Sequence, residues 1–155
     1  MMFYRKNICF PLIFFTCIFL FYSCNEKKPI TQQPSTNEIL AVDLAFSDMS
    51  RQVGMKKAFL QFMDNEGTLL RPDRMPVVGA DAIDLLSVLS DTAYTLSWKP
   101  MKAEISKSGE LGYSYGIYEL ILPDTTLNGT YVNIWKKEND GEWKFVLNSN
   151  NAGLQ

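Results

Sequence analysis

Hydrophobic positions in the first half of the folded region recur at helical spacing. Within residues 35–54 they follow one another at steps of three and four, which places them on one face of a helix. Ser35 and Glu38 stand three residues apart at the start of this segment, the spacing of a capping box. Residues 55–64 and 80–90 show the same periodicity. The pattern therefore predicts three helices. The apolar face of the first consists of Ile39, Val42, Phe46, Met49 and Val53.

From Tyr94 onward the pattern changes to the alternation that is typical of strands. Residues 67–70 predict one further short strand before this point. Asn139-Asp140-Gly141 is a strong signal for a tight hairpin turn between the last two strands. We therefore predict an α+β domain, in which three N-terminal helices pack on a curved antiparallel meander of four strands with an extra short strand. The meander strands are expected over residues 94–106, 111–122, 130–138 and 142–149.

The second meander strand alternates large and small side chains. Gly112, Ser114 and Gly116 share one face, and Leu111, Tyr113, Tyr115 and Ile117 share the other. We expect Tyr113 and Tyr115 to face the interior. The opposite, outer face is then expected to carry the apolar row Tyr118, Leu120, Val132 and Ile134. Such a row is costly in water, so we predict that it is covered in a homodimer that forms through the sheet.

The N-terminus has the three parts of a secretory signal: a basic start, an apolar run over residues 8–22, and a small residue, Ser23, before Cys24. It resembles a bacterial lipoprotein signal, which implies that the chain is cut before Cys24 and lipidated on it. The alternative is an uncleaved anchor helix, but the run is short for a span. We predict a signal peptide over 1–23, a flexible tether over 24–35 and a folded domain over 36–152. The product is expected to be exported and lipid-anchored to a bacterial membrane, on the periplasmic face or at the cell surface.

The amino-acid composition excludes several kinds of catalytic and metal-binding site. The chain has no histidine, and its three cysteines all lie within the first 24 residues, so the folded region has no histidine-based catalytic set and no thiolate site. The net charge of −2 includes Arg5 and Lys6, the only charges before Cys24; the remainder has 13 basic and 17 acidic residues and carries −4. This acidic balance disfavours nucleic acid as a partner. We expect no metal and no cofactor.

The order of the predicted elements resembles that of the nuclear transport factor two-like superfamily, which includes ketosteroid isomerase and the SnoaL-like polyketide cyclases. Three passages carry the resemblance: "FLQFMDNEGTLLRPDRMPVVG", "LGYSYGIYEL" and "NIWKKENDGEWKFVLNS". The likeness extends from Thr36 to about Ala152. It implies a cone-shaped fold with one deep, mostly apolar cavity. Because one fold hosts many functions, it does not by itself imply a reaction.

The resembling isomerases carry their catalytic aspartate directly before a proline, and here that position is Arg71, before Pro72. Arginine stays protonated and cannot act as the base. We therefore expect no catalytic residue of the isomerase type. Arginines near the cavity mouth suit an anionic group, while aromatic and amide side chains suit the rest of a small ligand. The predicted ligand-binding residues are Arg71, Arg74, Trp98, Tyr113, Tyr115, Asn133, Trp135 and Asn148. The alternative for the aromatic residues is a role in the core alone, and for the arginines a place in a solvated loop.

Two hypotheses of different classes follow. The first is a membrane-tethered binding module whose cavity holds a small, partly apolar ligand. The second is an enzyme of the cyclase or isomerase kind with an unusual acid–base set, such as Tyr115 with Asp43 or Glu119. A carboxylate inside the cavity with a pKa raised by burial favours the enzyme, and a lining of aromatic and amide groups favours binding. A purely structural role in the envelope is a third possibility.

Overall fold

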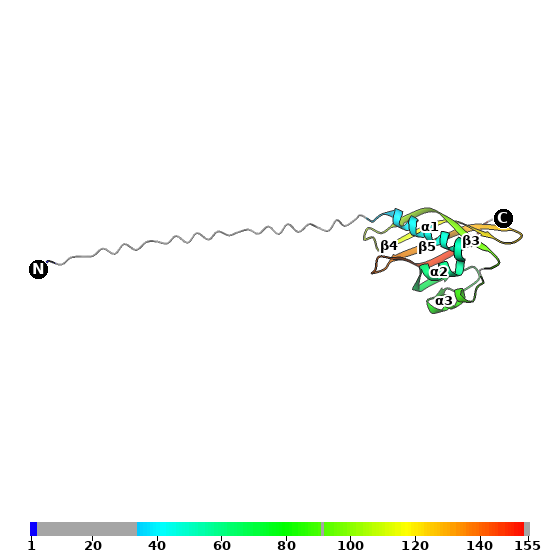
Figure 1. Cartoon of the computed structure of the whole chain (residues 1–155), viewed down its shortest axis with the longest axis horizontal. Helices are drawn as coiled ribbons and strands as arrows, with labels where there is room; N and C mark the ends of the chain where they lie inside the picture. Colours follow the sequence, from blue (N-terminus) through cyan, green and yellow to red (C-terminus); the bar gives the residue numbers. More distant parts are fainter. Residues whose placement is uncertain (3–33, 91, 154–155) are drawn as a thin grey trace. The chain divides into compact units, whose positions relative to one another are not determined.

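The structure, a computed structural model, describes residues 1–2, 34–90 and 92–153. The helices and strands all belong to one compact unit over residues 32–155 (Figure 1). The predicted signal peptide beyond residue 2, Cys24 and the tether up to residue 33 lie outside the described residues.

Three helices form among the described residues, as the sequence predicts. They are α1 (Thr36–Val53), α2 (Met55–Phe62) and α3 (Ala80–Ser87), with α2 between the other two (Figure 1). The Ser35 side chain caps α1 by accepting a hydrogen bond from the backbone N–H of Asn37. Gly54 separates α1 from α2 with a φ of 95°, a conformation that glycine adopts without strain. No helix in the described part of the chain has the length and apolar character needed to cross a membrane.

The strands form one six-stranded sheet in the order β2-β1-β6-β5-β4-β3. The meander β3-β4-β5-β6 is antiparallel throughout, and β1 pairs with β6 in parallel and with β2 antiparallel. The predicted α+β architecture is confirmed, with β1 and β2 extending the meander at the β6 side. The strands are β1 (Met63–Leu70), β2 (Val77–Val78), β3 (Thr95–Ile105), β4 (Leu111–Ile121), β5 (Thr126–Lys137) and β6 (Trp143–Ala152).

Several element boundaries differ from the prediction. Helix α3 ends at Ser87 rather than at residue 90, and β6 extends to Ala152 rather than to residue 149. Strand β1 begins at Met63, where the sequence predicts the end of a helix. Val77 and Val78, predicted as loop, pair with Leu69 and Thr68 as β2. Strand β5 begins at Thr126, because Ile121 already pairs with Thr126 across a short turn.

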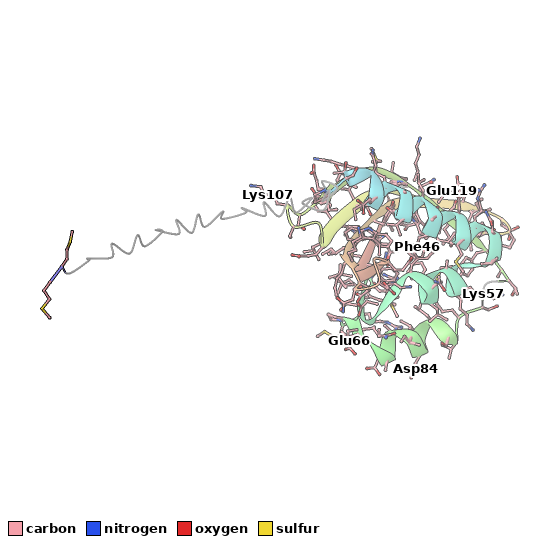
Figure 2. The ribbon with its side chains drawn as sticks, turned by 60° about the vertical axis from the view of Figure 1, so that its left-hand side comes forward. Phe46, Lys57, Glu66, Asp84, Lys107 and Glu119 are labelled. Carbon is pink, nitrogen blue, oxygen red and sulfur yellow. The ribbon has the colours of Figure 1, made fainter. Side chains whose placement is uncertain are left out.

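The core lies between the helices and the inner face of the sheet. Phe46 of α1 is at its centre and is fully buried (Figure 2). Its ring centroid lies 4.5 Å from that of Trp98, 4.8 Å from that of Phe59 and 5.4 Å from that of Phe145. Aromatic contacts of this kind add to the stabilisation from buried area alone.

Helix α1 is also tied to β3, the edge strand of the sheet, through two buried serines. The Ser47 hydroxyl donates to the backbone carbonyl of Trp98 and accepts from its backbone N–H, both at 2.7 Å. The Ser50 hydroxyl donates to the carbonyl of Leu96, also at 2.7 Å. These contacts satisfy edge groups that would otherwise face solvent.

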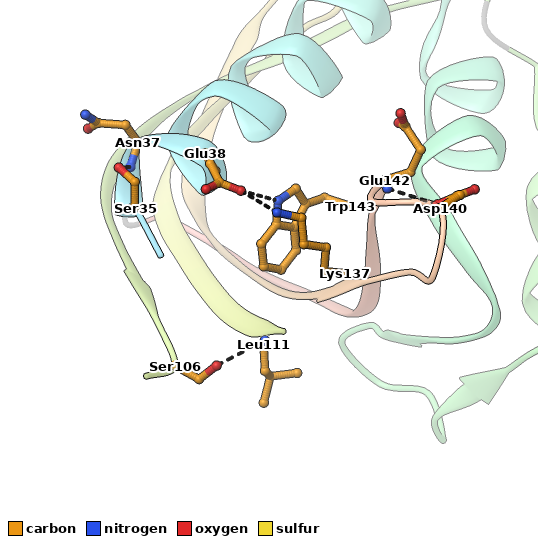
Figure 3. Close-up of polar contacts among 9 residues, drawn as sticks. All are labelled: Ser35, Asn37, Glu38, Ser106, Leu111, Lys137, Asp140, Glu142 and Trp143. Carbon is orange, nitrogen blue, oxygen red and sulfur yellow. Dashed lines mark hydrogen bonds and ion pairs between the residues drawn. The ribbon is translucent and has the colours of Figure 1, made fainter. Parts of the chain in front are cut away.

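The first turn of α1 is fixed to the hairpin between β5 and β6. Glu38 forms an ion pair with Lys137 at 2.7 Å and accepts a hydrogen bond from the indole N–H of Trp143 at 3.3 Å (Figure 3). The Lys137 ammonium lies 5.4 Å from the centroid of the Trp143 ring. The hydrogen bond from Lys137 lowers the pKa of Glu38 below its ordinary value of 4.5.

Candidate functional site

A cavity of about 210 Å³ lies between α2 and the inner face of strands β3 to β6. This volume is below the usual range for pockets that bind drug-sized ligands. Its apolar lining consists of Met55, Phe59, Leu96, Trp98, Tyr118 and Leu120. Its polar lining consists of Arg71, Tyr131, Asn133, Asn148 and Asn150.

Asp43 of α1 lies behind the polar wall of the cavity and accepts hydrogen bonds from the side chains that form this wall. Its side chain is fully buried and does not line the cavity. One carboxylate oxygen, Oδ1, accepts hydrogen bonds from the indole N–H of Trp98 at 2.8 Å and the amide of Asn133 at 3.2 Å. The other, Oδ2, accepts one from the Tyr131 hydroxyl at 2.8 Å. Ser114 is a further hydrogen-bond partner of the carboxylate.

Burial raises the pKa of Asp43 above its ordinary value of 3.8, because desolvation disfavours the charged form. The hydrogen bonds from Ser114, Tyr131, Trp98 and Asn133 act in the opposite direction and stabilise the carboxylate. Burial, together with the nearby Asp43, also raises the pKa of Tyr131. The Tyr131 hydroxyl therefore keeps its proton at neutral pH and directs it at Asp43.

The two amides beside Asp43 form a directed chain. Asn133 donates its amide N–H to Asp43, so its own oxygen Oδ1 faces Asn148, whose Nδ2 donates to it at 2.6 Å. Asn133 is fully buried and Asn148 is nearly so. Strands β5 and β6 place the two asparagines directly opposite each other, on the same face. The cavity wall is therefore held in one hydrogen-bonding arrangement.

Arg71, which follows β1, brings a positive charge to the cavity. Its Nη1 donates to the backbone carbonyl of Leu70 at 2.9 Å and to that of Asn148 at 3.3 Å, and the guanidinium carbon lies 5.9 Å from the centroid of the Phe59 ring. Burial lowers the pKa of Arg71 to about 10, so it stays charged at neutral pH. None of the ion pairs among the described residues involves Arg71.

The structure brings four of the predicted ligand-binding residues together in this cavity: Arg71, Trp98, Asn133 and Asn148. Arg74 lies exposed in the loop before β2 and does not line it. Trp135 is fully buried outside it and donates its indole N–H to Ser114 at 2.8 Å, so it belongs to the core.

The prediction that Tyr113 and Tyr115 face the interior is wrong. Their side chains are 39% and 42% exposed on the outer face of the sheet. The small residues of β4 face inward because α1 packs closely there; a Cβ atom on Gly112 would lie 2.9 Å from the side chain of Ile39. Tyr118 shares this inner face and lines the cavity.

The outer face of the sheet is accordingly composed differently from the prediction. Val132 and Ile134 lie on it as expected, since they pair with Tyr115 and Tyr113 across β4 and β5. Tyr118 and Leu120, both expected on the outer face, instead line the cavity. We call the apolar row on this face of β4 and β5 the outer patch. It consists of the exposed residues Leu111, Tyr113, Tyr115 and Ile117 and the half-buried residues Val132 and Ile134.

Sequence reasoning missed the central role of Asp43 and the presence of Asn150 in the wall. Asp43 is one acidic residue among helical positions, but with Ile39 and Phe46 it belongs to the buried stripe of α1. Its spacing from Ile39 was a usable signal, because positions four apart lie on one helix face. Asn150 follows Asn148 by two residues on the same strand, so strand alternation places both on one face.

Comparisons with known proteins bear on the fold. No family model matches the sequence, and no curated protein matches it. Solved structures do match. A ketosteroid isomerase-like protein from Erwinia carotovora atroseptica is 12% identical over 81% of this chain and 99% of its own, with a TM-score of 0.60. A domain with a cystatin-like fold from Nostoc punctiforme is 16% identical over 77% of each chain, with a TM-score of 0.62.

An NTF2-like protein of unknown function from Prochlorococcus marinus is 22% identical over 78% of this chain and 94% of its own, with a TM-score of 0.58. This chain has the NTF2-like fold. At these identities the likeness concerns the fold alone, and the function of the NTF2-like domain has to be argued from its own cavity.

Proposed function

We propose that this protein is an exported, lipid-anchored envelope protein whose NTF2-like domain binds a small, partly apolar anion without catalysing a reaction. The observation that carries the proposal is the guanidinium of Arg71, which lines the cavity and forms none of the ion pairs of the described residues. A largely buried charge without a counter-charge is costly, and an anionic ligand would compensate it.

The remaining lining supports an organic anion over an inorganic one. Phe59, Trp98 and Tyr118 offer aromatic surface next to the charge, and Leu96 and Leu120 add aliphatic surface. Binding would bury the apolar body of the ligand against these side chains while the guanidinium binds its carboxylate through two N–H groups. The small volume favours a compact acid.

The arrangement supports binding over catalysis. Asp43 has the raised pKa expected of a catalytic acid, which is the observation that favours an enzyme. However, both of its oxygens accept hydrogen bonds and its side chain is fully covered. Tyr115 and Glu119 lie on the opposite, outer face of β4, so neither can act together with Asp43 in the cavity.

The anchor is proposed from the apolar run, Ser23 and Cys24, as a bacterial lipoprotein would carry them. The outer patch supports the further proposal of a homodimer through the sheet, since four of its residues are 39–48% exposed: Leu111, Tyr113, Tyr115 and Ile117.

The test is isothermal titration calorimetry of the purified full-length chain with phenylacetate and with its neutral amide. We expect phenylacetate to bind more tightly. Arg71→Ala should weaken its binding by about 1.5–3 kcal/mol, the range for a hydrogen bond to a charged group. Arg74→Ala is the matched control, because Arg74 is exposed and lies outside the cavity. Equal binding of phenylacetate by the parent and the Arg71→Ala variant would contradict the proposal.

Catalysis has its own assay. The full-length chain should leave a ketosteroid substrate unchanged, since Arg71 cannot abstract a proton. Isomerisation that is lost in the Asp43→Asn variant would favour the enzyme instead.

A further inference from the structure

The amide side chains at the polar end of the cavity offer hydrogen-bond acceptors to a ligand. Asp43 is an acceptor, so Asn133 must turn its N–H toward it and its oxygen toward Asn148. Asn148 must then use its N–H for Asn133. The groups of Asn148 that remain for a ligand are its side-chain oxygen and its second amide N–H. A carboxylate that no ligand touches thus decides which way the cavity amides face.

Asn150, the next residue of β6 on the same face, adds a second acceptor. It lines the cavity, and its Oδ1 is buried without a hydrogen-bond partner among the described residues. An unsatisfied buried carbonyl is costly. The last side-chain bond of asparagine turns readily, so a small rotation would bring this oxygen to a donor held in the cavity.

The charged group and the unpartnered oxygen belong to different points of the cavity wall. The Arg71 guanidinium bonds the backbone carbonyl of Asn148, whereas the unpartnered oxygen belongs to Asn150, two residues along the strand. A ligand that satisfies both groups therefore carries its anion and its hydrogen-bond donor at separate positions.

We propose that the ligand is a small carboxylic acid with a hydroxyl or N–H donor at the end of an apolar ring or chain that lies away from the carboxylate. The carboxylate binds Arg71, the apolar body packs against Trp98 and Tyr118, and the donor binds the oxygen of Asn150. This inference rests on the proposed function, since it refines the ligand of the same cavity.

The experiment uses titration calorimetry of the full-length chain with three probes: phenylacetate, 4-hydroxyphenylacetate and 2-hydroxyphenylacetate. The para isomer places its hydroxyl at the far end of the ring, and the ortho isomer places it beside the carboxylate arm. We expect the para isomer to bind about fivefold to tenfold more tightly than phenylacetate, the gain of one hydrogen bond to an unsatisfied acceptor. The ortho isomer should show no such gain.

Asn150→Leu should abolish the preference for the para isomer, so that within this variant the para isomer and phenylacetate bind with affinities within about twofold of each other. Asn151→Leu is the matched control, because Asn151 is exposed on the neighbouring, outward position of the same strand. Circular dichroism checks that both variants are folded. If Asn150→Leu is not folded, Asn150→Ser, which shortens the side chain, is used in its place.

The outcomes separate the two proposals. If phenylacetate binds and depends on Arg71 but the para isomer gains nothing, the donor-bearing ligand is overturned and the anion site stands. If the para preference persists in the Asn150→Leu variant, or the ortho isomer binds best, the assignment of the donor to Asn150 is overturned. If none of the three acids binds, the proposed function itself fails.

Discussion

Replacing Asp43 tests whether one buried carboxylate holds the cavity wall together. In the Asp43→Ala variant the indole N–H of Trp98 and the amide N–H of Asn133 lose their shared acceptor, and neither group can rotate within its packed setting to find another. Each buried donor without a partner costs about 1–3 kcal/mol. The hydroxyl of Tyr131 can turn elsewhere, so we count two donors and expect a loss of about 4 kcal/mol in the free energy of unfolding.

Asp43→Asn is the matched control. Its amide oxygen can still accept from Trp98 and Asn133, and its amide nitrogen can donate to the Tyr131 hydroxyl oxygen, which both donates and accepts. It also removes a charge from a buried place. We therefore expect a loss below about 2 kcal/mol. Urea unfolding of the parent and the two variants measures both losses in the free energy of unfolding, provided that the dependence on urea concentration has the same slope in all three. Equal destabilisation by Asn and Ala, or a loss below about 1 kcal/mol in Asp43→Ala, would refute the hydrogen-bonding role.

The stability difference between the parent and the Asp43→Asn variant should change with pH in a direction that the pKa of Asp43 determines. Because folding raises the pKa of Asp43, the folded protein keeps this proton to higher pH than the unfolded chain does. The contribution of Asp43 to stability is therefore most favourable below its ordinary pKa of 3.8 and declines as pH rises toward the folded value. Relative to the Asp43→Asn variant, the parent should lose stability as pH rises from about 4. If the parent instead gained stability relative to Asp43→Asn as pH rises, this result would contradict a raised pKa of Asp43.

The remaining predictions concern other parts of the chain. Folding lowers the pKa of Glu38, so its contribution to stability is present above pH 4.5 and is lost as pH falls through the folded pKa. The stability difference between the parent and Glu38→Gln, measured by urea unfolding at a series of pH values, should therefore disappear at acidic pH. A difference that stays constant with pH would argue against the ion pair with Lys137. Cys24→Ser should leave an unprocessed precursor on immunoblots of cell fractions, and an unchanged mature mass in the membrane fraction would rule out the lipoprotein signal. At micromolar concentration the parent should sediment as a dimer and Tyr115→Lys as a monomer, since a charge in the outer patch is costly to bury; a monomeric parent removes this proposal.

Local pattern predicted the helices and the antiparallel meander, because both depend on neighbouring residues. It could not place β1 and β2 in full. Strand β1 is completed by a parallel partner, β6, far along the chain, and Met63 gains strand geometry only beside Phe145. The sequence predicts a loop up to residue 129, because Gly129 is typical of loops, but β5 already begins at Thr126. In the sheet Gly129 allows a close approach: a Cβ atom there would lie 2.5 Å from the Tyr118 ring.

Alternation along β4 showed which residues share a face but not which face is covered. Large residues such as Tyr113 looked like the interior set, yet the helix covers the small ones. For the site, Arg71 was found because the resemblance singled out its position. Asp43 was named only as a candidate acid or base, and its hydrogen bonds to Trp98 and Asn133 could not be predicted, since these residues lie more than fifty residues away along the chain.

The covered edge of β3 limits how copies of this protein can assemble. Ser47 and Ser50 occupy the hydrogen-bonding groups of Leu96 and Trp98 that an incoming strand would need, and Pro100 has no N–H to offer. At the opposite end of the sheet, β2 is only two residues long. Neither end offers a long template for a further strand, so the sheet resists fibre-like growth. Association through the outer patch would use the same face of both copies and leave no such face free, so it would give a closed dimer.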